Sequence, residues 1–134
     1  MFMNTRCKKR VPIDCPARLI FVGPARKALK INLPNGVSRK DADRIIDAKL
    51  CDISTAGCAI DSPYLVPPGL VLKIEADPSV FAAAIKGHRT MKLKFIAKVT
   101  SCVMRSPGHY RIGAHFQKMK KTDLAIVEHF VASH

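Results

Sequence analysis

The sequence predicts an all-β domain, a six-stranded antiparallel β-barrel with a C-terminal α-helix and short connecting helices. Three observations support this fold class. About six short apolar segments are separated by turn signals rich in Gly, Pro and Asn. Over 91–99, every odd position is apolar and the even positions include Lys92, Lys94 and Lys98, the pattern of a half-buried antiparallel strand. The length of 134 residues suits one domain with one core.

The expected domain is single and covers residues 1–134, with the barrel over 11–120 and the terminal helix over 121–134. Residues 1–10 are basic and lack apolar periodicity, which predicts a mobile arm. The apolar run over 17–22 predicts the first strand.

Two prolines, Pro12 and Pro16, precede this strand and indicate an edge or entry segment, because proline cannot donate a ladder hydrogen bond. Residues 23–43 are rich in Gly, Pro, Asn and charge, which predicts a long connection. The next strand is expected over 45–53, and Gly57 then breaks the chain. The side chains expected to share one face of this strand are Ile46, Ala48 and Leu50.

In the second half, strands are expected to start at 58–60 and to cover 70–75. A long strand from 91 to about 104 turns at 106–108 into a return strand over 110–116. The side chains expected to face inward from this hairpin are Met91, Leu93, Phe95, Ala97, Val99, Tyr110, Ile112, Ala114 and Phe116.

Two helices are also expected. Over 77–87, Asp77 would be the N-cap, Pro78 the first helical residue and Gly87 the C-cap. The terminal helix would begin at its cap, Thr122. Its apolar stripe would be formed by Leu124, Val127, Phe130 and Val131.

The net charge of +13 favours an anionic partner, a class that includes nucleotides, nucleic acids and acidic proteins. Each apolar segment is shorter than the roughly 20 residues that span a bilayer. The basic N-terminus is not followed by the apolar stretch of a secretory signal. We therefore expect a cytoplasmic protein without membrane insertion.

Catalysis and metal binding find little support in the sequence. The five histidines have no metal-ligand spacing, and no pair of carboxylates stands out as acid and base. The five cysteines include no C-x-x-C pair, so reduced and mostly buried thiols are expected. We expect no enzyme, no catalytic residue, no metal and no cofactor.

The N-terminal arm carries two arginines four positions apart, Arg6 and Arg10. A guanidinium pairs bidentately with phosphate oxygens or with guanine O6 and N7, and its flat face stacks on a base. A solvated basic arm without a ligand has the same pattern. The motif alone therefore leaves both interpretations open.

A second motif consists of Asp52, Ser54 and Gly57. The Asp52 carboxylate can accept guanine N1–H and N2–H or hold an arginine of the arm, and the Ser54 hydroxyl can donate to a phosphate or a base. Gly57 lets the backbone turn tightly or approach a ligand closely. The same residue types are common in turns, so this motif alone also fits a turn. The two motifs strengthen each other, because both would serve one anionic purine ligand.

In this order, and in a small β-rich chain, the two motifs resemble the nucleotide site of a PilZ domain. The family pattern is Arg-x-x-x-Arg, a strand, then Asp/Asn-x-Ser-x-x-Gly, and a closing strand of the type Arg-Ile-Gly-Val-x-Phe before a helix. Residues 111–116 are Arg-Ile-Gly-Ala-His-Phe, and the likeness runs from about residue 5 to the C-terminus. The resemblance implies a six-stranded antiparallel barrel and a non-catalytic receptor for cyclic di-GMP, a bacterial second messenger.

By this resemblance, Arg6 and Arg10 would bind the phosphates and guanine edges of cyclic di-GMP. Asp52, Ser54 and Gly57 would bind the other side of the ligand. The arm would become ordered on binding and alter the surface presented to a downstream protein. Such an adaptor would regulate a bacterial process such as motility, biofilm formation or virulence. The connection over 23–43 is longer than the family usually has.

Two other functions stay open. A basic barrel with outward Lys92, Lys94 and Lys98 could bind single-stranded nucleic acid. Only 6% of the residues are aromatic, so stacking platforms are scarce and specific nucleic-acid binding is not expected. Alternatively, the barrel could be an adaptor that docks a protein regardless of nucleotide. Selectivity for one cyclic dinucleotide would distinguish the receptor, whereas a steep fall of binding with salt would indicate nucleic acid.

Overall fold

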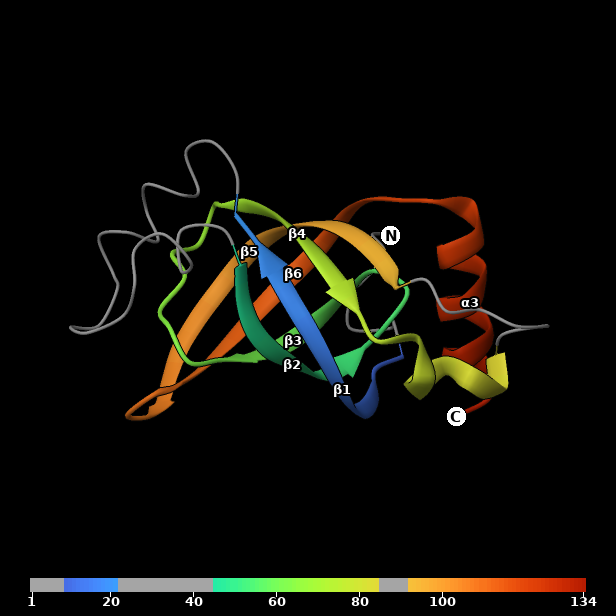
Figure 1. Cartoon of the computed structure of the whole chain (residues 1–134), viewed down its shortest axis with the longest axis horizontal. Coiled ribbons are helices and arrows are strands. Elements are labelled where there is room, and N and C mark those ends of the chain that lie inside the picture. Colours follow the sequence, from blue (N-terminus) through green and yellow to red (C-terminus); the bar gives the residue numbers. More distant parts are fainter. Residues whose placement is uncertain (1–8, 22–44, 85–91) are drawn as a thin grey trace, which may run out of the picture.

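The structure is a computed structural model and describes residues 9–21, 45–84 and 92–134. The strands are β1 (Val11–Ile20), β2 (Ile45–Ile53), β3 (Gly57–Ser62), β4 (Val71–Ala76), β5 (Leu93–Ser106) and β6 (His109–Met119). They close into an antiparallel barrel in the order β1-β2-β3-β6-β5-β4 (Figure 1). The helix α3 (Lys121–Ala132) follows the last strand. The fold class predicted from the sequence is thereby confirmed.

The first strand begins at Val11, earlier than the start predicted at residue 17. Its first part is paired with β2, and β4 joins β1 only from Ala17 onward. Pro12 and Pro16 therefore lie in the part of β1 that does not pair with β4, where their missing N–H groups cost no hydrogen bond to that strand. This agrees with the predicted entry segment. Pairing with β2 extends the strand through both prolines, which their residue types alone did not indicate.

A β-bulge in β2 turns Asp52 toward the outer surface. Leu50 and Asp52 pair with adjacent residues of β3, so Cys51 is an extra residue on β2. An extra residue reverses the alternation of side chains between the two faces of a strand. Leu50 and Ile53 are accordingly both fully buried, although they are an odd number of positions apart. The shared face predicted for the earlier part of β2 is confirmed, with Ala48 only half-buried.

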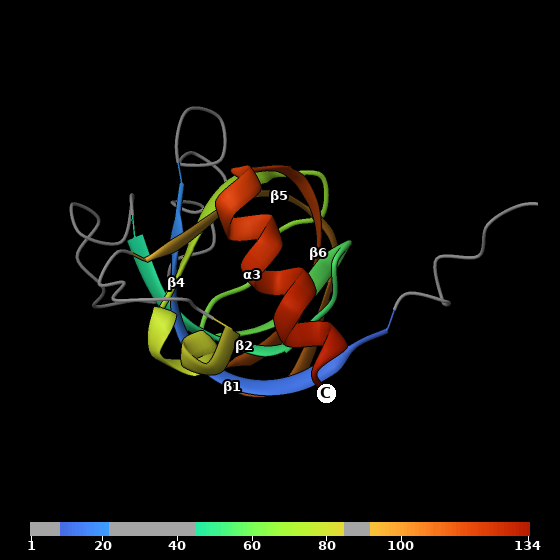
Figure 2. The ribbon, with the colours of Figure 1, turned by 90° about the vertical axis from the view of Figure 1, so that its right-hand side faces the viewer.

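One end of the barrel is covered by α3 and by a short 3₁₀ helix, η2 (Pro78–Ala84) (Figure 2). The rings of Phe81 and Phe130 meet edge to face with centroids 4.9 Å apart, which joins the two helices. The short helix predicted over 77–87 is confirmed within its described part, where it has 3₁₀ geometry. Short connecting helices commonly take this geometry. Asp77 does accept a hydrogen bond from the Ser79 amide at 2.9 Å, as a cap does.

The terminal helix begins at Lys121, as its predicted range does, but the predicted cap is wrong. The N-cap position is Lys120, which makes no side-chain cap hydrogen bond, so Thr122 lies inside the helix. Asp123 in the first turn is buried and accepts a hydrogen bond from the Lys94 amide at 3.2 Å. Docking of this turn on β5 therefore places the start. The predicted apolar stripe is confirmed, with Leu124 half-buried.

The hairpin of β5 and β6 follows the predicted alternation. Its buried side chains are Leu93, Phe95, Ala97, Val99, Ile112 and Ala114. Tyr110 and Phe116 are half-buried. Far from α3, the hairpin extends past the rest of the barrel (Figure 1). Its exposed apolar side chains there are Val103 and Met104.

Several predictions lie outside the described residues. These are the mobile arm over 1–8, the long connection over 23–43, the C-cap at Gly87 and the inward position of Met91. Arg10, at the end of the predicted arm, is described and leads directly into β1.

Candidate functional site

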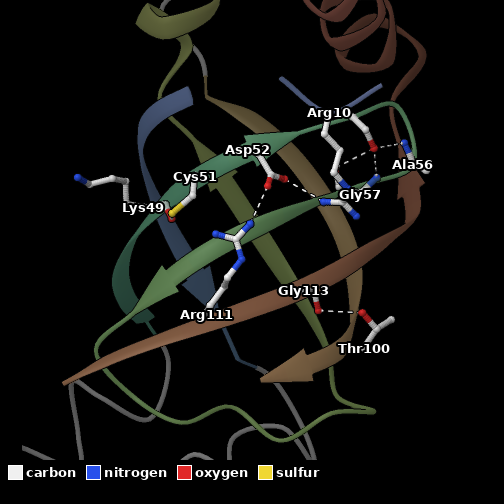
Figure 3. Close-up of polar contacts among 10 residues, drawn as sticks. Arg10, Lys49, Cys51, Asp52, Ala56, Gly57, Thr100, Arg111 and Gly113 are labelled. Carbon is white, nitrogen blue, oxygen red and sulfur yellow. Dashed lines mark hydrogen bonds and ion pairs between the residues drawn. The ribbon is translucent and has the colours of Figure 1, made fainter. Parts of the chain in front are cut away.

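Asp52 joins the two sequence motifs. Its Oδ1 accepts a hydrogen bond from Arg10 Nη1 at 2.9 Å, and its Oδ2 accepts one from Arg111 Nη2 at 2.9 Å. Figure 3 shows the carboxylate between the two guanidinium groups, which reach it from opposite sides. Arg10 comes from the N-terminal motif and Arg111 from β6, so three distant segments of the chain meet at one carboxylate.

The strand register produces this meeting. Pro12 lies opposite Asp52, so the residue pairs of β1 and β2 bring Arg10 close to the carboxylate. On the other side, Ala59 lies opposite both Asp52 and Gly113 in the β2-β3-β6 sheet. These small residues leave room on the outer face of the sheet. The side chain of Arg111, an outward neighbour of Gly113, reaches across β3 to Asp52.

The exposures indicate that the cluster orients charges more than it stabilises the fold. The Asp52 side chain is 15% exposed, whereas those of Arg10 and Arg111 are 57% and 43% exposed. Ion pairs with exposed partners contribute only about 0.2–1 kcal/mol to stability. Each guanidinium carries five N–H donors, of which Asp52 needs only a few. The two cations are therefore held in place with much of their hydrogen-bonding capacity facing solvent.

Ser54 is buried, and its hydroxyl closes a tight turn between β2 and β3. Its Oγ accepts hydrogen bonds from the amides of Ala56 and Gly57, each at 3.1 Å. The Ser54 amide donates to the Gly57 carbonyl at 2.8 Å. The structure therefore gives Ser54 the turn role that its residue type also suggested.

Gly57 is required by the close approach of β6. A Cβ atom at this position would lie 2.3 Å from the carbonyl oxygen of Ala114, which is a backbone atom and cannot swing away. The Phe116 amide donates to the Ala56 carbonyl at 2.8 Å and holds β6 against the turn. Gly57 thus sets the spacing between the turn and β6, the strand that carries Arg111.

A hollow of about 380 Å³ adjoins this cluster on the outer surface. Arg111 belongs both to the hollow and to the Asp52 cluster. His109 Nδ1 and Asp61 Oδ2 lie 3.4 Å apart at its edge. Burial, and next the charge of Asp61, raise the pKa of the Cys51 thiol at this hollow. The lining residues are Cys51, Ile60, Asp61, Arg105, Ser106, His109 and Arg111.

Of the five site residues predicted from the sequence, Arg10 and Asp52 are in contact, and Ser54 and Gly57 form the turn that follows Asp52. Arg6 lies outside the described residues. No ligand-binding role was predicted for Asp61, Arg105, His109 or Arg111, although Arg111 opens the closing-strand motif. The alternating pattern of β6 does predict that the side chain of Arg111 points outward. It does not tell which other outward side chains lie beside Arg111 on the surface.

The PilZ domain family profile matches residues 5–133 of the sequence. The chain belongs to the PilZ domain family. No curated protein sequence matches the chain. Solved structures, among them two of PilZ domains, are similar to it in fold, at sequence identities of 10–15%.

One similar structure is the Bacillus subtilis inhibitor of motility, MotI/DgrA, with a TM-score of 0.61 and 10% identity. The match covers 98% of this PilZ chain but 51% of that one, so the chain spans about half of that protein's length. Another is the PilZ domain of YcgR from Escherichia coli with c-di-GMP, at a TM-score of 0.57 and 12% identity. That match covers 97% of this chain and 91% of the YcgR domain. A third is a tetrameric PilZ domain from Xanthomonas campestris, at a TM-score of 0.58 and 15% identity, where the match covers 95% of this chain and 88% of the other.

Two searches of the described residues bear on other sites. None of their helices is long and apolar enough to cross a membrane. Within the same ranges, no group of three or more His, Cys, Asp or Glu side chains is arranged to hold a metal ion.

Proposed function

We propose that this PilZ domain is a non-catalytic cytoplasmic receptor for cyclic di-GMP that regulates a downstream protein. The observation that carries the proposal is the contact between Arg10 and Asp52 at 2.9 Å, because it makes one site of two motifs that are far apart in sequence. Membership of the PilZ family supports the identity of the ligand. So does the YcgR structure, which contains cyclic di-GMP.

The chemistry of the cluster suits a ligand with two phosphates and two guanines. Asp52 fixes one nitrogen of each arginine, which leaves the outer donors of Arg10 and Arg111 for phosphate oxygens or for guanine O6 and N7. Holding a flexible arginine in place beforehand lowers the entropy that binding would otherwise cost. By its position in the motif, Arg6 joins the same ligand from the arm.

The switch would act through the arm and the surface around it. The exposed pair of Arg10 and Asp52 is weak, so a doubly charged ligand can rearrange it at small cost. Ordering the arm costs entropy, which new charge-assisted hydrogen bonds to phosphate must exceed. The changed surface then binds or releases the partner. The similarity to an inhibitor of motility makes motility the first process to examine, beside biofilm formation and virulence.

Calorimetric titration of the full chain with cyclic di-GMP at about 0.15 M salt tests this function. We expect selective binding over GMP and cyclic di-AMP. Arg10→Gln should weaken binding about 10- to 150-fold, the value of hydrogen bonds to charged groups. Arg18→Gln is the matched control, because Arg18 lies on the same side of the chain in β1 and pairs with Asp47 at 3.7 Å, with a similar exposure of 50%. Absence of binding by the folded wild type would contradict the proposal.

A second surface keeps nucleic-acid binding as an alternative. A hollow of about 430 Å³ on β4, β5 and β6 is lined by Lys73, Lys94, Lys118 and Lys120. Phe95 also lines it but is fully buried, so it offers no stacking platform. Binding at this surface would depend on charge alone. It would weaken steeply with salt and would not distinguish cyclic di-GMP from other polyanions.

A further inference from the structure

We propose that the lysine-lined hollow on β4, β5 and β6 docks an acidic segment of a partner protein, which inserts an apolar side chain between the lysines. The lysines of this hollow are Lys73, Lys94, Lys118 and Lys120. The inference goes beyond the proposed function, because it concerns a surface apart from the Asp52 cluster and needs no nucleotide. It follows from the strand register, from the unpaired charges of the lysines and from the apolar floor of the hollow.

The register of three neighbouring strands gathers the lysines around one apolar residue. Lys73 on β4 lies opposite Ile96 on β5, and Ile96 lies opposite Lys118 on β6. Directly opposite residues of an antiparallel pair point to the same face, so Ile96 lies on the outer surface with a lysine on each side. Lys94 and Lys120 line the same hollow. The four lysines are therefore gathered around Ile96 and not scattered over the barrel.

The lysines of the hollow carry charges that the described part of the chain does not pair. None of the four forms an ion pair with a carboxylate there. Glu75 lies opposite Lys94 in the register, but their side chains form no ion pair. Charges of one sign held close together repel each other, and carboxylates of a partner would relieve this repulsion. The surface is therefore electrostatically complementary to an acidic partner.

The floor of the hollow is apolar, a feature that binding by charge alone would not require. Phe95 is fully buried there, and Ile96 and Met119 are half-buried. Lys73 and Lys94 are also half-buried, as expected when the aliphatic stem of a lysine covers apolar surface and its ammonium group stays in water. An apolar centre with a polar rim is the usual composition of a protein–protein interface. The hollow, of about 430 Å³, thus suits an apolar side chain flanked by carboxylates.

Other occupants fit this surface less well. A second copy of the chain would bring its own net charge of +13 to a basic surface. A single-stranded nucleic acid would use the lysines but not the floor, since the buried Phe95 ring offers no stacking platform. An anionic membrane surface would likewise use the charges alone. An acidic protein segment with an apolar residue uses both the rim and the floor.

Two labelled peptides test the inference with the full chain at about 0.15 M salt. One has the sequence Glu-Asp-Glu-Leu-Glu-Asp-Glu, and the other has Ser in place of Leu. Fluorescence anisotropy measures both affinities. We expect the Leu peptide to bind at least about fivefold more tightly, because its apolar side chain is buried on the floor of the hollow. Ile96→Thr, which keeps a β-branched residue in the strand, should reduce this preference.

A pair of lysine variants tests the location. Lys118→Gln should weaken binding of the Leu peptide about two- to fivefold, the value of one exposed ion pair. Lys49→Gln is the matched control and should leave it unchanged, because Lys49 is an exposed lysine of β2 that pairs with Asp14 at 3.3 Å. Thermal melts establish that all variants are folded.

The outcomes separate this inference from the proposed function. Equal affinities of the Leu and Ser peptides, no binding of either, or equal losses in Lys118→Gln and Lys49→Gln would overturn the inference. So would displacement of the Leu peptide by a thymidine oligonucleotide or by phosphatidylglycerol vesicles at lower concentration than by the unlabelled peptide, in favour of a nucleic acid or a membrane. A wild type that binds the Leu peptide in this way but not cyclic di-GMP would support the inference and refute the proposed function.

Discussion

The position of one extra residue decides what Asp52 can do. Without the bulge at Cys51, the alternation of β2 would point Asp52 into an apolar core, where an unpaired carboxylate is costly. With the bulge, the carboxylate lies at the surface between Arg10 and Arg111. Bulges commonly re-aim side chains beside functional sites. The motif that the sequence reveals therefore depends on an irregularity that it does not reveal.

At Gly57, adding a single methyl group should be costly. Because a Cβ would lie 2.3 Å from the Ala114 carbonyl oxygen, Gly57→Ala must move β6 or the turn, and we expect a loss of about 1–3 kcal/mol in the free energy of unfolding. Gly113→Ala is the control. Its Cβ would meet the Ser101 Oγ at 2.6 Å, a side-chain atom that can rotate away. Urea unfolding checks both, and equal losses would show that the backbone contact is not limiting.

Ionisation of two buried thiols should lower the stability of the fold at alkaline pH. Burial raises the pKa of Cys15 to about 11 and raises that of Cys58 as well. In the unfolded chain these thiols ionise near pH 8.5, so the folded state holds more protons above that pH. The stabilisation is present below about pH 8.5 and is lost as the pH rises toward 11.

Urea unfolding under reducing conditions at pH 7.5 and pH 9.5 measures this loss. Cys15→Ala should show a smaller decrease in unfolding free energy between the two pH values than the wild type does. Cys102→Ala, at a half-buried position, is the comparison. A Cys15→Ala decrease as large as that of the wild type would count against burial of this thiol as the cause.

The contact of Arg10 with Asp52 could be predicted from the residue types, whereas the neighbours supplied by β3 and β6 could not. Arg10 and Asp52 are recognisable because their spacing and chemistry suit one ligand. Arg111 and Asp61 are cross-strand neighbours only through the register of β3 and β6. Pairing between segments far apart in sequence is set by the whole sheet, so no local pattern discloses it.

Among the elements, the β5 and β6 hairpin was the most predictable, because strict alternation reports a strand with one buried face. Helix details were less predictable. The 3₁₀ form of η2 and the cap of α3 both involve contacts with other elements, namely Phe81 with Phe130 and Asp123 with the Lys94 amide. In α3, the contact of Asp123 outweighs the local preference for a cap at Thr122.

The packing of α3 on η2 should be important for stability. Phe130 is 6% exposed and its ring meets Phe81 edge to face, so Phe130→Ala should lower the free energy of unfolding by about 3–5 kcal/mol. His129→Ala, at an exposed position of the same helix, should change it by less than about 0.5 kcal/mol. Chemical denaturation measures both. A loss below 1 kcal/mol for Phe130→Ala would mean that α3 contributes little to the closed barrel.

On the scale of the whole molecule, the net charge of +13 is distributed over more than one face. The Asp52 cluster and its hollow lie on the β1, β2, β3 and β6 side, whereas the lysine-lined hollow lies on β4, β5 and β6. A polyanion could bind at either face. If the protein is a cyclic di-GMP receptor, the ligand should bind at the face of the Asp52 cluster and not at the lysine-lined hollow.

Residue-resolved NMR of backbone amides, recorded during titration with cyclic di-GMP at about 0.15 M salt, shows directly whether the ligand binds beside Asp52. The largest shifts should occur at Arg10, from Asp52 to Gly57 and from His109 to Arg111, with small shifts at Lys73 and Lys118. Largest shifts around the lysine-lined hollow, or none at all with a folded protein, would contradict this prediction.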